Sequence, residues 1–456
     1  MTSGSSGSPG PRLPRGAGNT LVTRGYRGTW ADLPRLGLPP VAAALVDGHG
    51  AAASAAWEHT LTPRETLVVS GRRVDEEQAE ELRAAGFALV PLSGPVSPAA
   101  AQPPTAAQPP TAAQPSTAVQ PPTAVRPPDE GRLWLMTSGS TGRPKRVAHT
   151  LQSLTTVAAD QPARRWLCPY APGAYAWWQV VTLSLSHPGQ DVVFVEPDEL
   201  AGWPELALAE GVTAVSGTPT FWRQALLGAG DAVARLPLQQ VTLGGEPVDQ
   251  SILDRLTDLF PTARVSWIYA SSEAGASIAV HDGRAGFPVS WLERSAPRRP
   301  RLSVTDGELL IDSEWSADGF SGPLRTGDRA EVLGDRVHLP GRIASDEINV
   351  GGSKASATAV RRVLLAHPGV AWAQVRGRRA PLVGAVVSAD VVLTTPVTGA
   401  TTPASASPAR ATTATATTVT TELTRWCADR LPDHAVPRRI RLLDEIPIKE
   451  TLKSDV

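Results

Sequence analysis

The sequence predicts an α/β protein with a large N-terminal domain of layered α/β subdomains, built on parallel-rich sheets, and a small α+β C-terminal domain. Three observations lead to this fold class. Strand-like apolar runs alternate with helical patterns over residues 129–340, the order typical of a largely parallel sheet. A shorter block, residues 341–456, mixes both patterns. At about 150 residues per domain, the chain of 456 residues provides two or three folded units.

The elements follow in order along the chain. Residues 20–97 contain the amphipathic run EEQAEELRAAG, in which Gly86 is typical of a helix C-cap, and the apolar runs TLVVS and FALVPL. Next come four expected strands, LWLM, DVVFV, QQVTLGG and RVSWIYA. Helical patterns follow the first three strands, namely HTLQSLTTVAAD, ELAGWPELALAEG and DQSILDRLTDLF. The last block has helices over KASATAVRRVLLAHPG and around ELTRWCADRL, with strands at VAWAQV and LVGAVV.

Biased tracts interrupt this order. A six-residue Pro/Ala/Thr unit repeats over residues 98–128 and is expected to be an extended spacer, because proline donates no backbone hydrogen bond. Residues 394–421 are nearly all Thr, Ala, Pro and Ser and are a second expected surface insertion. Residues 1–19 are expected to be a disordered lead-in. The predicted large domain is therefore 20–340, and the small domain is 341–456.

Charge and cysteine content exclude several classes of protein. The 43 basic residues nearly balance 44 acidic ones, so no global positive field would hold nucleic acid. Two cysteines cannot make a disulfide framework and suit a reducing compartment. No run approaches the ~18 apolar residues of a membrane-spanning helix, and the N-terminus has no apolar core of signal-peptide type. We expect a soluble, cytoplasmic protein without nucleic-acid or membrane partners.

The strongest local motif is the loop TSGSTGRPK, which follows the apolar run LWLM. Backbone N–H groups and hydroxyls in such a loop can bind phosphate oxygens, and a lysine adds a compact positive charge. It is not a Walker loop, because Pro144 precedes the lysine and Arg146 follows it. A flexible polar turn is the alternative. The expected phosphate contacts are Thr137, Ser138, Gly139, Ser140, Thr141, Gly142 and Lys145.

This loop and the motifs after it, in the same order, resemble the adenylate-forming superfamily of acyl- and aryl-CoA synthetases, peptide-synthetase adenylation domains and luciferases. The resemblance covers roughly residues 130–456. A lysine near the end of the chain, Lys453, lies where that family has its C-terminal catalytic lysine. The other matching motifs are GGEP at 244–247, YASSE at 269–273, RTGD at 325–328, GR at 341–342 and DEINVGGSK at 346–354.

For the nucleotide, the resemblance implies an adenine ring stacked on Tyr269 and a ribose held through both hydroxyls by Asp328. A carboxylate can accept two hydroxyl hydrogen bonds at once, so Asp328 is suited to a diol. The alternatives are a surface turn for Asp328 and plain core for Tyr269. Outside the phosphate loop, the implied ATP- and AMP-binding residues are Gly245, Glu246, Pro247, Tyr269, Ser272, Asp328 and Arg342.

For catalysis, the resemblance implies Lys453, Lys145 and Glu273. Lys453 would bridge the substrate carboxylate and the α-phosphate of ATP, and Glu273 would hold Mg²⁺, which neutralises charge developing on the phosphates. The family's usual Asn-Gly before the last lysine is Thr451-Leu452 here, so Lys449 is a rival to Lys453.

The small domain is expected to be mobile, because relatives pivot theirs after the arginine of the GR motif. Ala344 stands where the pivot residue is often Asp, which makes Ser345 or Asp346 the expected hinge. Gly351 and Gly352 would line the thiol path, because glycine lets backbone pass close to a pantetheine arm.

The acid pocket is expected between the phosphate loop and the adenine-stacking motif. Amino-acid-activating relatives have an Asp there that pairs with the α-amine, and residues 173–178 contain none, which favours an aryl or acyl acid. Tryptophans in such positions are as often simple core. The candidate lining residues are Tyr175, Trp177, Trp222 and Ala270. Arginine clusters at 294–301, 376–379 and 438–441 are interpreted as solvated surface rather than as a seat for CoA phosphates.

The implied function is that of an ATP-dependent, AMP-forming ligase that uses Mg²⁺, with CoA as the favoured thiol acceptor. Three alternatives stay open at the level of sequence: a diazotase that activates nitrite for an aromatic amine, acyl transfer to a carrier protein, and a non-enzymatic relative that binds a ligand.

Overall fold

A computed structural model of the chain describes residues 14–93, 131–137, 145–157, 159–295, 299–380, 384–394, 408–447 and 452–453. It divides into two compact units, Met1–Ala201 with Ala317–Gly319, and Gly202–Ser316 with Phe320–Val456. The predicted domain boundary at residue 340 stays a prediction. The Pro/Ala/Thr repeat, most of the lead-in and Lys449 lie outside the described residues.

The first unit contains a five-stranded sheet in the order β5-β3-β4-β6-β7. Only the last pair, β6 with β7, is antiparallel. The strands are β3 (Val41–Val46), β4 (Glu65–Ser70), β5 (Ala88–Leu92), β6 (Arg132–Thr137) and β7 (Lys145–His149). Helix α1 (His49–Leu61), whose alanines are buried, packs on β3 and β4, and α2 (Glu76–Ala84) contacts β5.

Four more strands of the first unit lie in the order β8-β9-β1-β2. They are β1 (Thr20–Thr23), β2 (Tyr26–Thr29), β8 (Arg164–Cys168) and β9 (Gln190–Phe194), with only β1 and β2 antiparallel. Helix α4 (Tyr175–Ser186) contacts β8 and β9, and α3 (Leu151–Leu154) contacts β7 and α4.

The second unit begins with the strand order β13-β12-β11-β10, in which only β12 and β13 are antiparallel. The strands are β10 (Ala214–Gly217), β11 (Gln240–Gly244), β12 (Arg264–Ser271) and β13 (Gly275–Val280). Helix α5 (Trp203–Ala209) precedes β10, α6 (Pro219–Gly228) and α7 (Gly230–Ala234) connect β10 to β11, and α8 (Gln250–Leu259) connects β11 to β12. This β-α alternation is the predicted one.

An antiparallel sheet of the second unit has the order β14-β18-β17-β16-β15. Its strands are β14 (Phe287–Pro288), β15 (Arg301–Thr305), β16 (Glu308–Asp312), β17 (Leu324–Leu333) and β18 (Arg336–Arg342). It ends at α9 (Ile343–Asp346), a single helical turn that contacts β17 and β18.

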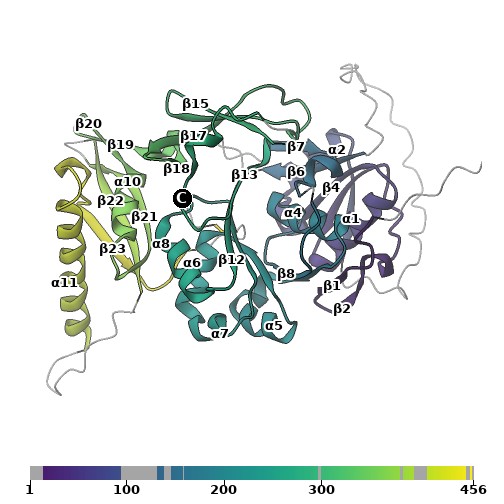
Figure 1. Ribbon diagram of the computed structural model, residues 1–456, viewed down its shortest axis with the longest axis horizontal. Helices are drawn as coiled ribbons and strands as arrows, with labels where there is room; N and C mark the ends of the chain where they lie inside the picture. The colour runs from purple at the N-terminus through teal and green to yellow at the C-terminus, as the bar shows by residue number, and fades with distance from the viewer. Residues whose placement is uncertain are drawn as a thin grey trace, which may run out of the picture. The chain divides into compact units, whose positions relative to one another are not determined.

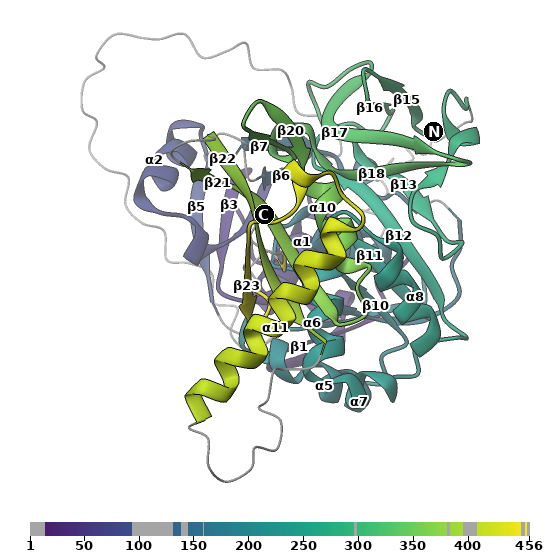
Figure 2. The same ribbon diagram turned by 90° about the vertical axis from the view of Figure 1, so that its left-hand side faces the viewer.

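The last sheet has the order β20-β19-β22-β21, and β23 pairs with β22. Its strands are β19 (Glu347–Val350), β20 (Ser353–Ser356), β21 (Val370–Ala380), β22 (Gly384–Leu393) and β23 (Arg439–Leu443). Helices α10 (Ala357–Leu365) and α11 (Pro408–Ala428) lie side by side against it (Figures 1 and 2). Val360, Leu364 and Leu423 from these helices share a core with Val387 and Val391 of β22.

The predicted fold class is confirmed, but two helices differ in length from the sequence patterns. The run HTLQSLTTVAAD gives only the one-turn α3, which ends where Thr155 adopts a non-helical backbone with φ −86° and ψ 82°. The β-branched Thr155, Thr156 and Val157 that follow the helix favour extended backbone. In contrast, α11 extends back to Pro408 and includes half of the Thr/Ala-rich tract. No Pro or Gly interrupts it after Pro408, and alanine is the best helix former. Among the described residues, no helix has the length and apolar character to span a bilayer.

Candidate active site

Asp328 is the centre of a polar cluster in the second unit. Its Oδ2 accepts a hydrogen bond from the Tyr269 hydroxyl at 2.5 Å, and its Oδ1 pairs with Arg342 Nε at 3.2 Å. Asp328 on β17 and Arg342 on β18 are direct cross-strand partners, whereas Tyr269 comes from β12. Burial, reinforced by the Asp328 charge, raises the pKa of Tyr269, so the phenol remains a donor. The structure therefore brings three sequence-predicted nucleotide contacts together.

The turn that presents Asp328 is shaped by Glu308, which sequence reasoning missed. Gly327 has a φ of +73°, and its N–H donates to Glu308 Oε1 at 2.8 Å. Arg325 pairs with the other carboxylate oxygen of Glu308. Because Glu308 is buried, its carboxylate is held by these two partners and fixes the RTGD turn. The one signal for it was an acid at the start of an apolar strand run, GELLID.

Thr326 completes this turn from the inside. Its Oγ1 donates to the Leu309 carbonyl at 2.8 Å and accepts from the Asp328 N–H at 3.1 Å. Its carbonyl accepts from Arg342 Nη1 at 2.9 Å. Arg342 thus contacts both the Asp328 carboxylate and the backbone of the RTGD motif, and these two contacts orient the carboxylate.

Lys453 lies against the GGEP loop. Gly245 has a φ of +83°, and a Cβ on it would be 3.2 Å from Lys453 Cε and 3.7 Å from Nζ. Lys453 keeps solvent exposure overall, yet partial desolvation of its ammonium lowers its pKa. The charge of Glu246 opposes this shift, Arg342 adds to it, and Asp328 opposes it. Lys453 therefore belongs electrostatically to the Asp328 cluster.

The GGEP loop is fixed on the first turn of α6. The Glu246 carboxylate accepts from the Thr220 N–H at 2.9 Å and from Thr220 Oγ1 at 3.0 Å. Its neighbour Pro247 has Cγ 3.9 Å from the position of a Cβ on Gly341, at the end of β18. The loop therefore lies between α6 and the strand that carries Arg342.

Glu273, the predicted magnesium ligand, is half-buried in the turn between β12 and β13, next to Ser272. Ala270, on the same strand as Tyr269, lies opposite Ala276 at a register shift. In the described part of the chain, no three His, Cys, Asp or Glu side chains converge as a metal site. A single carboxylate still fits Mg²⁺ here, because this ion is commonly bound by one or two carboxylates together with substrate phosphates.

The phosphate loop belongs to the first unit. Thr137 ends β6, Lys145 begins β7, and the two are antiparallel partners, so the strands close the loop between them. Lys145 is exposed. The predicted contacts Ser138, Gly139, Ser140, Thr141 and Gly142 lie outside the described residues.

The predicted pocket tryptophans are core residues. Trp177 and Trp222 are each 0% exposed. Trp177 donates through Nε1 to His49 Nδ1 at 3.2 Å, and Trp222 donates to the Thr242 carbonyl at 3.3 Å. Their surfaces and polar atoms are therefore committed to the protein interior. Tyr175, the first residue of α4, is half-buried, with its ring 6.0 Å from that of His149.

Asp346 connects the single turn of α9 to the start of α10. It is buried, accepts from the Thr358 N–H at 2.8 Å and from the Ser356 hydroxyl, and pairs with Arg329 Nε at 3.3 Å. These contacts fix α9 and the start of α10. The other predicted hinge residue, Ser345, is the third residue of α9.

Gly351 and Gly352 form a two-residue turn between β19 and β20, because Val350 and Ser353 pair across it. Their φ values of +59° and +90° require the left-handed region that glycine tolerates. Both are exposed.

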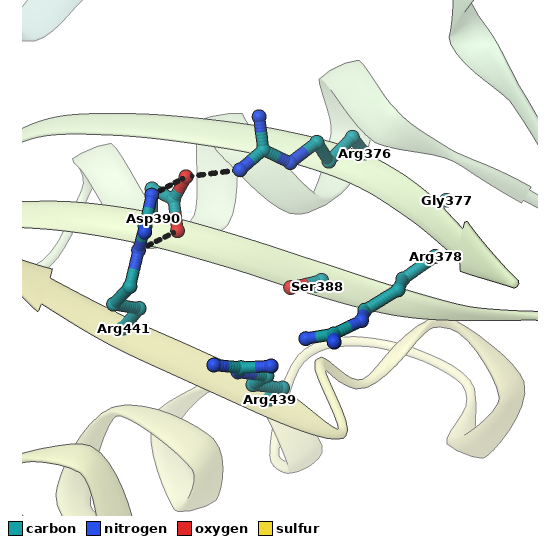
Figure 3. A pocket seen from close by; sticks show the side chains of 7 residues that line it. All are labelled: Arg376, Gly377, Arg378, Ser388, Asp390, Arg439 and Arg441. Atoms are coloured by element: carbon teal, nitrogen blue, oxygen red, sulfur yellow. Dashed lines mark hydrogen bonds and ion pairs between the residues drawn. The ribbon is translucent and has the colours of Figure 1, made fainter. Parts of the chain in front are cut away.

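A pocket lies on the last sheet, over β21, β22 and β23 (Figure 3). Asp390 forms ion pairs with two of its arginines, with Arg376 at 2.6 Å and with Arg441 at 2.9 Å. Arg378 and Arg439 extend toward each other beside Ser388 (Figure 3). The sequence interpretation of these clusters as plain solvated surface therefore omitted a pocket that two guanidinium groups line.

Comparison with known proteins gives the family. A model of the AMP-binding enzyme family matches residues 42–301, more than half of the chain, and a model of the AMP-binding enzyme C-terminal domain matches residues 360–453. The chain belongs to the AMP-binding enzyme family. The resemblance to the adenylate-forming superfamily that the motifs indicated is thereby confirmed.

Within this family, the chain is 28% identical to a probable nonribosomal peptide synthetase, CymA, of Salinispora arenicola over 69% of this chain and 4% of the relative. It is 28% identical to a 4-chlorobenzoate–CoA ligase of an Arthrobacter species over 58% of this chain and 56% of that one. The chain thus spans a small part of the first relative and about half of the second.

Among solved structures, the anthranilate CoA ligase AuaEII in complex with anthranoyl-AMP superposes with a TM-score of 0.67 at 16% identity, covering 96% of this chain and 93% of that one. At this identity, the likeness concerns the fold alone. It agrees with the layered α/β architecture described above.

Proposed function

We propose that this AMP-binding enzyme adenylates an aryl or acyl carboxylic acid with ATP, releases pyrophosphate, and transfers the acyl group to the thiol of CoA. The observation that carries the proposal is the convergence of Tyr269, Asp328 and Arg342 with Glu246 and Lys453 in one cluster of the second unit. The cluster combines an aromatic ring, a carboxylate suited to a diol, and a lysine beside them.

In the adenylation step, a carboxylate oxygen attacks the α-phosphorus of ATP, the bond to the β-phosphate oxygen breaks, and pyrophosphate leaves. The protein must hold two anions together while charge develops between them. We assign this task to Lys453, whose compact ammonium can contact both anions. Asp328 retains acceptor sites for ribose, since an ionised carboxylate has about four lone-pair sites and, among the described residues, its carboxylate contacts Tyr269 and Arg342.

The remaining assignments concern charge on the phosphates. Glu273 would hold Mg²⁺, which supplies neutralisation of the pyrophosphate when bound. Lys145 and the TSGSTG loop would bind the outer phosphates through backbone N–H groups and hydroxyls. Pivoting of the small domain near Ser345 and Asp346 would then bring the Gly351-Gly352 turn to the thiol path.

The acceptor is the finer part of the proposal, and two observations favour CoA. Several relatives, including the 4-chlorobenzoate ligase, are named as CoA ligases. In addition, Arg378 and Arg439 line a pocket with a serine hydroxyl, a combination that suits a phosphate. The likeness to a peptide synthetase keeps transfer to a carrier protein as the second candidate.

The proposed setting is the cytoplasm, where ATP and CoA are available. Both cysteines are buried and free, which agrees with a reducing compartment.

The test is AMP release across a panel of aryl and fatty acids, including 4-chlorobenzoate and anthranilate, with and without CoA, and with nitrite plus an aminoaryl acid. The proposal predicts release that depends on an acid and rises with CoA. No AMP release under any condition would refute the enzyme assignment. Release that requires nitrite and ignores CoA would establish the diazotase instead.

A second experiment addresses the phosphate pocket. The double variant Arg378→Gln with Arg439→Gln should raise KM for CoA, because it loses the proposed contacts with the 3′-phosphate. It should leave KM for dephospho-CoA unchanged, because dephospho-CoA has no 3′-phosphate. Arg83→Gln, on an exposed ion pair of α2, is the matched control. Equal changes in KM for CoA and for dephospho-CoA would show that this pocket does not bind the 3′-phosphate of CoA.

A further inference from the structure

The first turn of α6 contacts both sides of the Lys453 site. This turn consists of Thr218, the N-cap, followed by Pro219 and Thr220. Thr220 holds the Glu246 carboxylate, as described above. Thr218, which no motif singled out, is 1% exposed and has two hydrogen bonds of its own.

The Thr218 hydroxyl links α6 to the chain directly before Lys453. Its Oγ1 accepts from the Phe221 N–H at 3.0 Å, which caps the helix, and donates to the Leu452 carbonyl. The hydroxyl thus donates its single proton to the tail and accepts a hydrogen bond from the helix with a lone pair. A buried carbonyl without this donor would be costly, so the bond fixes the tail as well as the helix.

The residue that Thr218 holds determines where Lys453 points. Leu452 is buried and has a φ of +59°, a left-handed conformation that costs a non-glycine residue about 1–2 kcal/mol. Such a conformation persists only where surrounding contacts impose it. The Thr218 hydroxyl and the burial of the leucine side chain are those contacts. Together they turn the chain so that Lys453 lies along Gly245.

Helix α6 is itself anchored to the last sheet. Buried Arg223 donates to the Ala371 carbonyl of β21 at 2.7 Å and pairs with Asp249 at 2.6 Å. In the arrangement in which Lys453 lies along Gly245, the helix that bears Thr218 therefore contacts the last sheet as well as the tail.

We propose that Thr218 is a positioning residue for Lys453: its hydroxyl holds the Leu452 carbonyl and so aims the ammonium at the site of adenylate formation. It acts through Lys453 and contacts no substrate. This inference rests on the proposed adenylation. It predicts that loss of the hydroxyl impairs adenylation and leaves acyl transfer unaffected, because only the first step needs Lys453 at this place.

The test compares Thr218→Val, which can neither cap α6 nor hold the tail, with Thr218→Ser, which can do both. Asp75→Ala removes the N-cap of α2 in the first unit and controls for loss of a cap alone. Three quantities are measured on the full chain: ATP–pyrophosphate exchange with 4-chlorobenzoate or anthranilate, CoA-dependent turnover of the supplied acyl-adenylate, and hydrogen–deuterium exchange of the C-terminal peptide.

Thr218→Val should lose about 10- to 100-fold in kcat for pyrophosphate exchange, the scale expected for a misplaced catalytic group. Its acyl-adenylate turnover should stay within about twofold of wild type, and its C-terminal peptide should exchange faster. Thr218→Ser should restore all three values, and Asp75→Ala should match wild type once rates are normalised to folded protein.

A wild-type rate of ATP–pyrophosphate exchange in the Thr218→Val variant would overturn the positioning role. So would an equal loss of both half-reactions with unchanged deuterium exchange of the C-terminal peptide. Absence of pyrophosphate exchange in the wild-type protein with every acid would refute the proposed function instead. Deuterium exchange needs no substrate, so an unchanged C-terminal peptide in Thr218→Val would then still reject the positioning role.

Discussion

Leu452 offers a test in which glycine should be better than alanine. Both substitutions remove the buried side chain, so both weaken docking of the tail. They differ in backbone strain, because the φ of +59° is unfavourable for alanine and acceptable for glycine. In an ordinary helix or strand the order is reversed.

The size of the difference follows from two terms. Relief of the left-handed conformation favours glycine by about 1–2 kcal/mol. The greater freedom of glycine in the undocked tail opposes this by about 0.5–1 kcal/mol. At the mid-values of about 1.5 and 0.75 kcal/mol, the balance is about 0.75 kcal/mol in favour of glycine, which is roughly a three- to fourfold difference in the docked population. Burial of Leu452 suggests that both variants are well below wild type.

The assay is ATP–pyrophosphate exchange, measured for Leu452→Gly, Leu452→Ala and wild type at saturating ATP. We expect the rates to fall in the order wild type, glycine, alanine. Deuterium exchange of the C-terminal peptide should increase in the same order. An alanine variant equal to or faster than the glycine variant would refute the claim that the left-handed turn aims Lys453.

Three further predictions concern neighbours of Lys453. Glu246→Gln removes a charge that raises the pKa of Lys453, so the pyrophosphate-exchange rate, which needs the protonated lysine, should decline at lower pH than in wild type; an unshifted alkaline limb would contradict the coupling. Gly245→Ala combines a φ of +83° with a methyl 3.2 Å from Lys453 Cε, so adenylation should fall about tenfold or more, and a wild-type rate would show that the lysine lies elsewhere. Asp328→Asn should lower kcat/KM for ATP by about 10- to 100-fold, whereas unchanged ATP kinetics would exclude it from the ribose site.

Much of the fold was predictable because it depends on local patterns. The alternation of apolar runs with helical patterns predicted the β-α order of residues 203–271. Gly86, with a φ of +87°, follows the end of α2, as its position in the sequence indicated. Helices with conflicting signals were not predictable in length. Helix α3 ends where the β-branched Thr155 leaves the helical conformation, and the second half of the Thr/Ala-rich tract forms α11 because no Pro or Gly follows Pro408.

Motifs also identified Tyr269, Asp328 and Arg342, which the structure brings together. Glu308 and Thr218 were missed because their roles depend on polar contacts with residues distant in sequence, and neither residue type is distinctive. The pocket tryptophans show the converse difficulty. An aromatic slot and a closed core both favour tryptophan, and only the packing distinguishes them.

The most direct test of the whole account measures the two half-reactions of Lys453→Ala separately. The account predicts that ATP–pyrophosphate exchange is abolished, because the variant lacks the ammonium that lies against Gly245 and interacts electrostatically with Glu246 and Asp328. It predicts that transfer from a supplied acyl-adenylate to CoA stays close to the wild-type rate. Equal loss of both steps, or retained pyrophosphate exchange, would show that Lys453 is not the adenylation lysine.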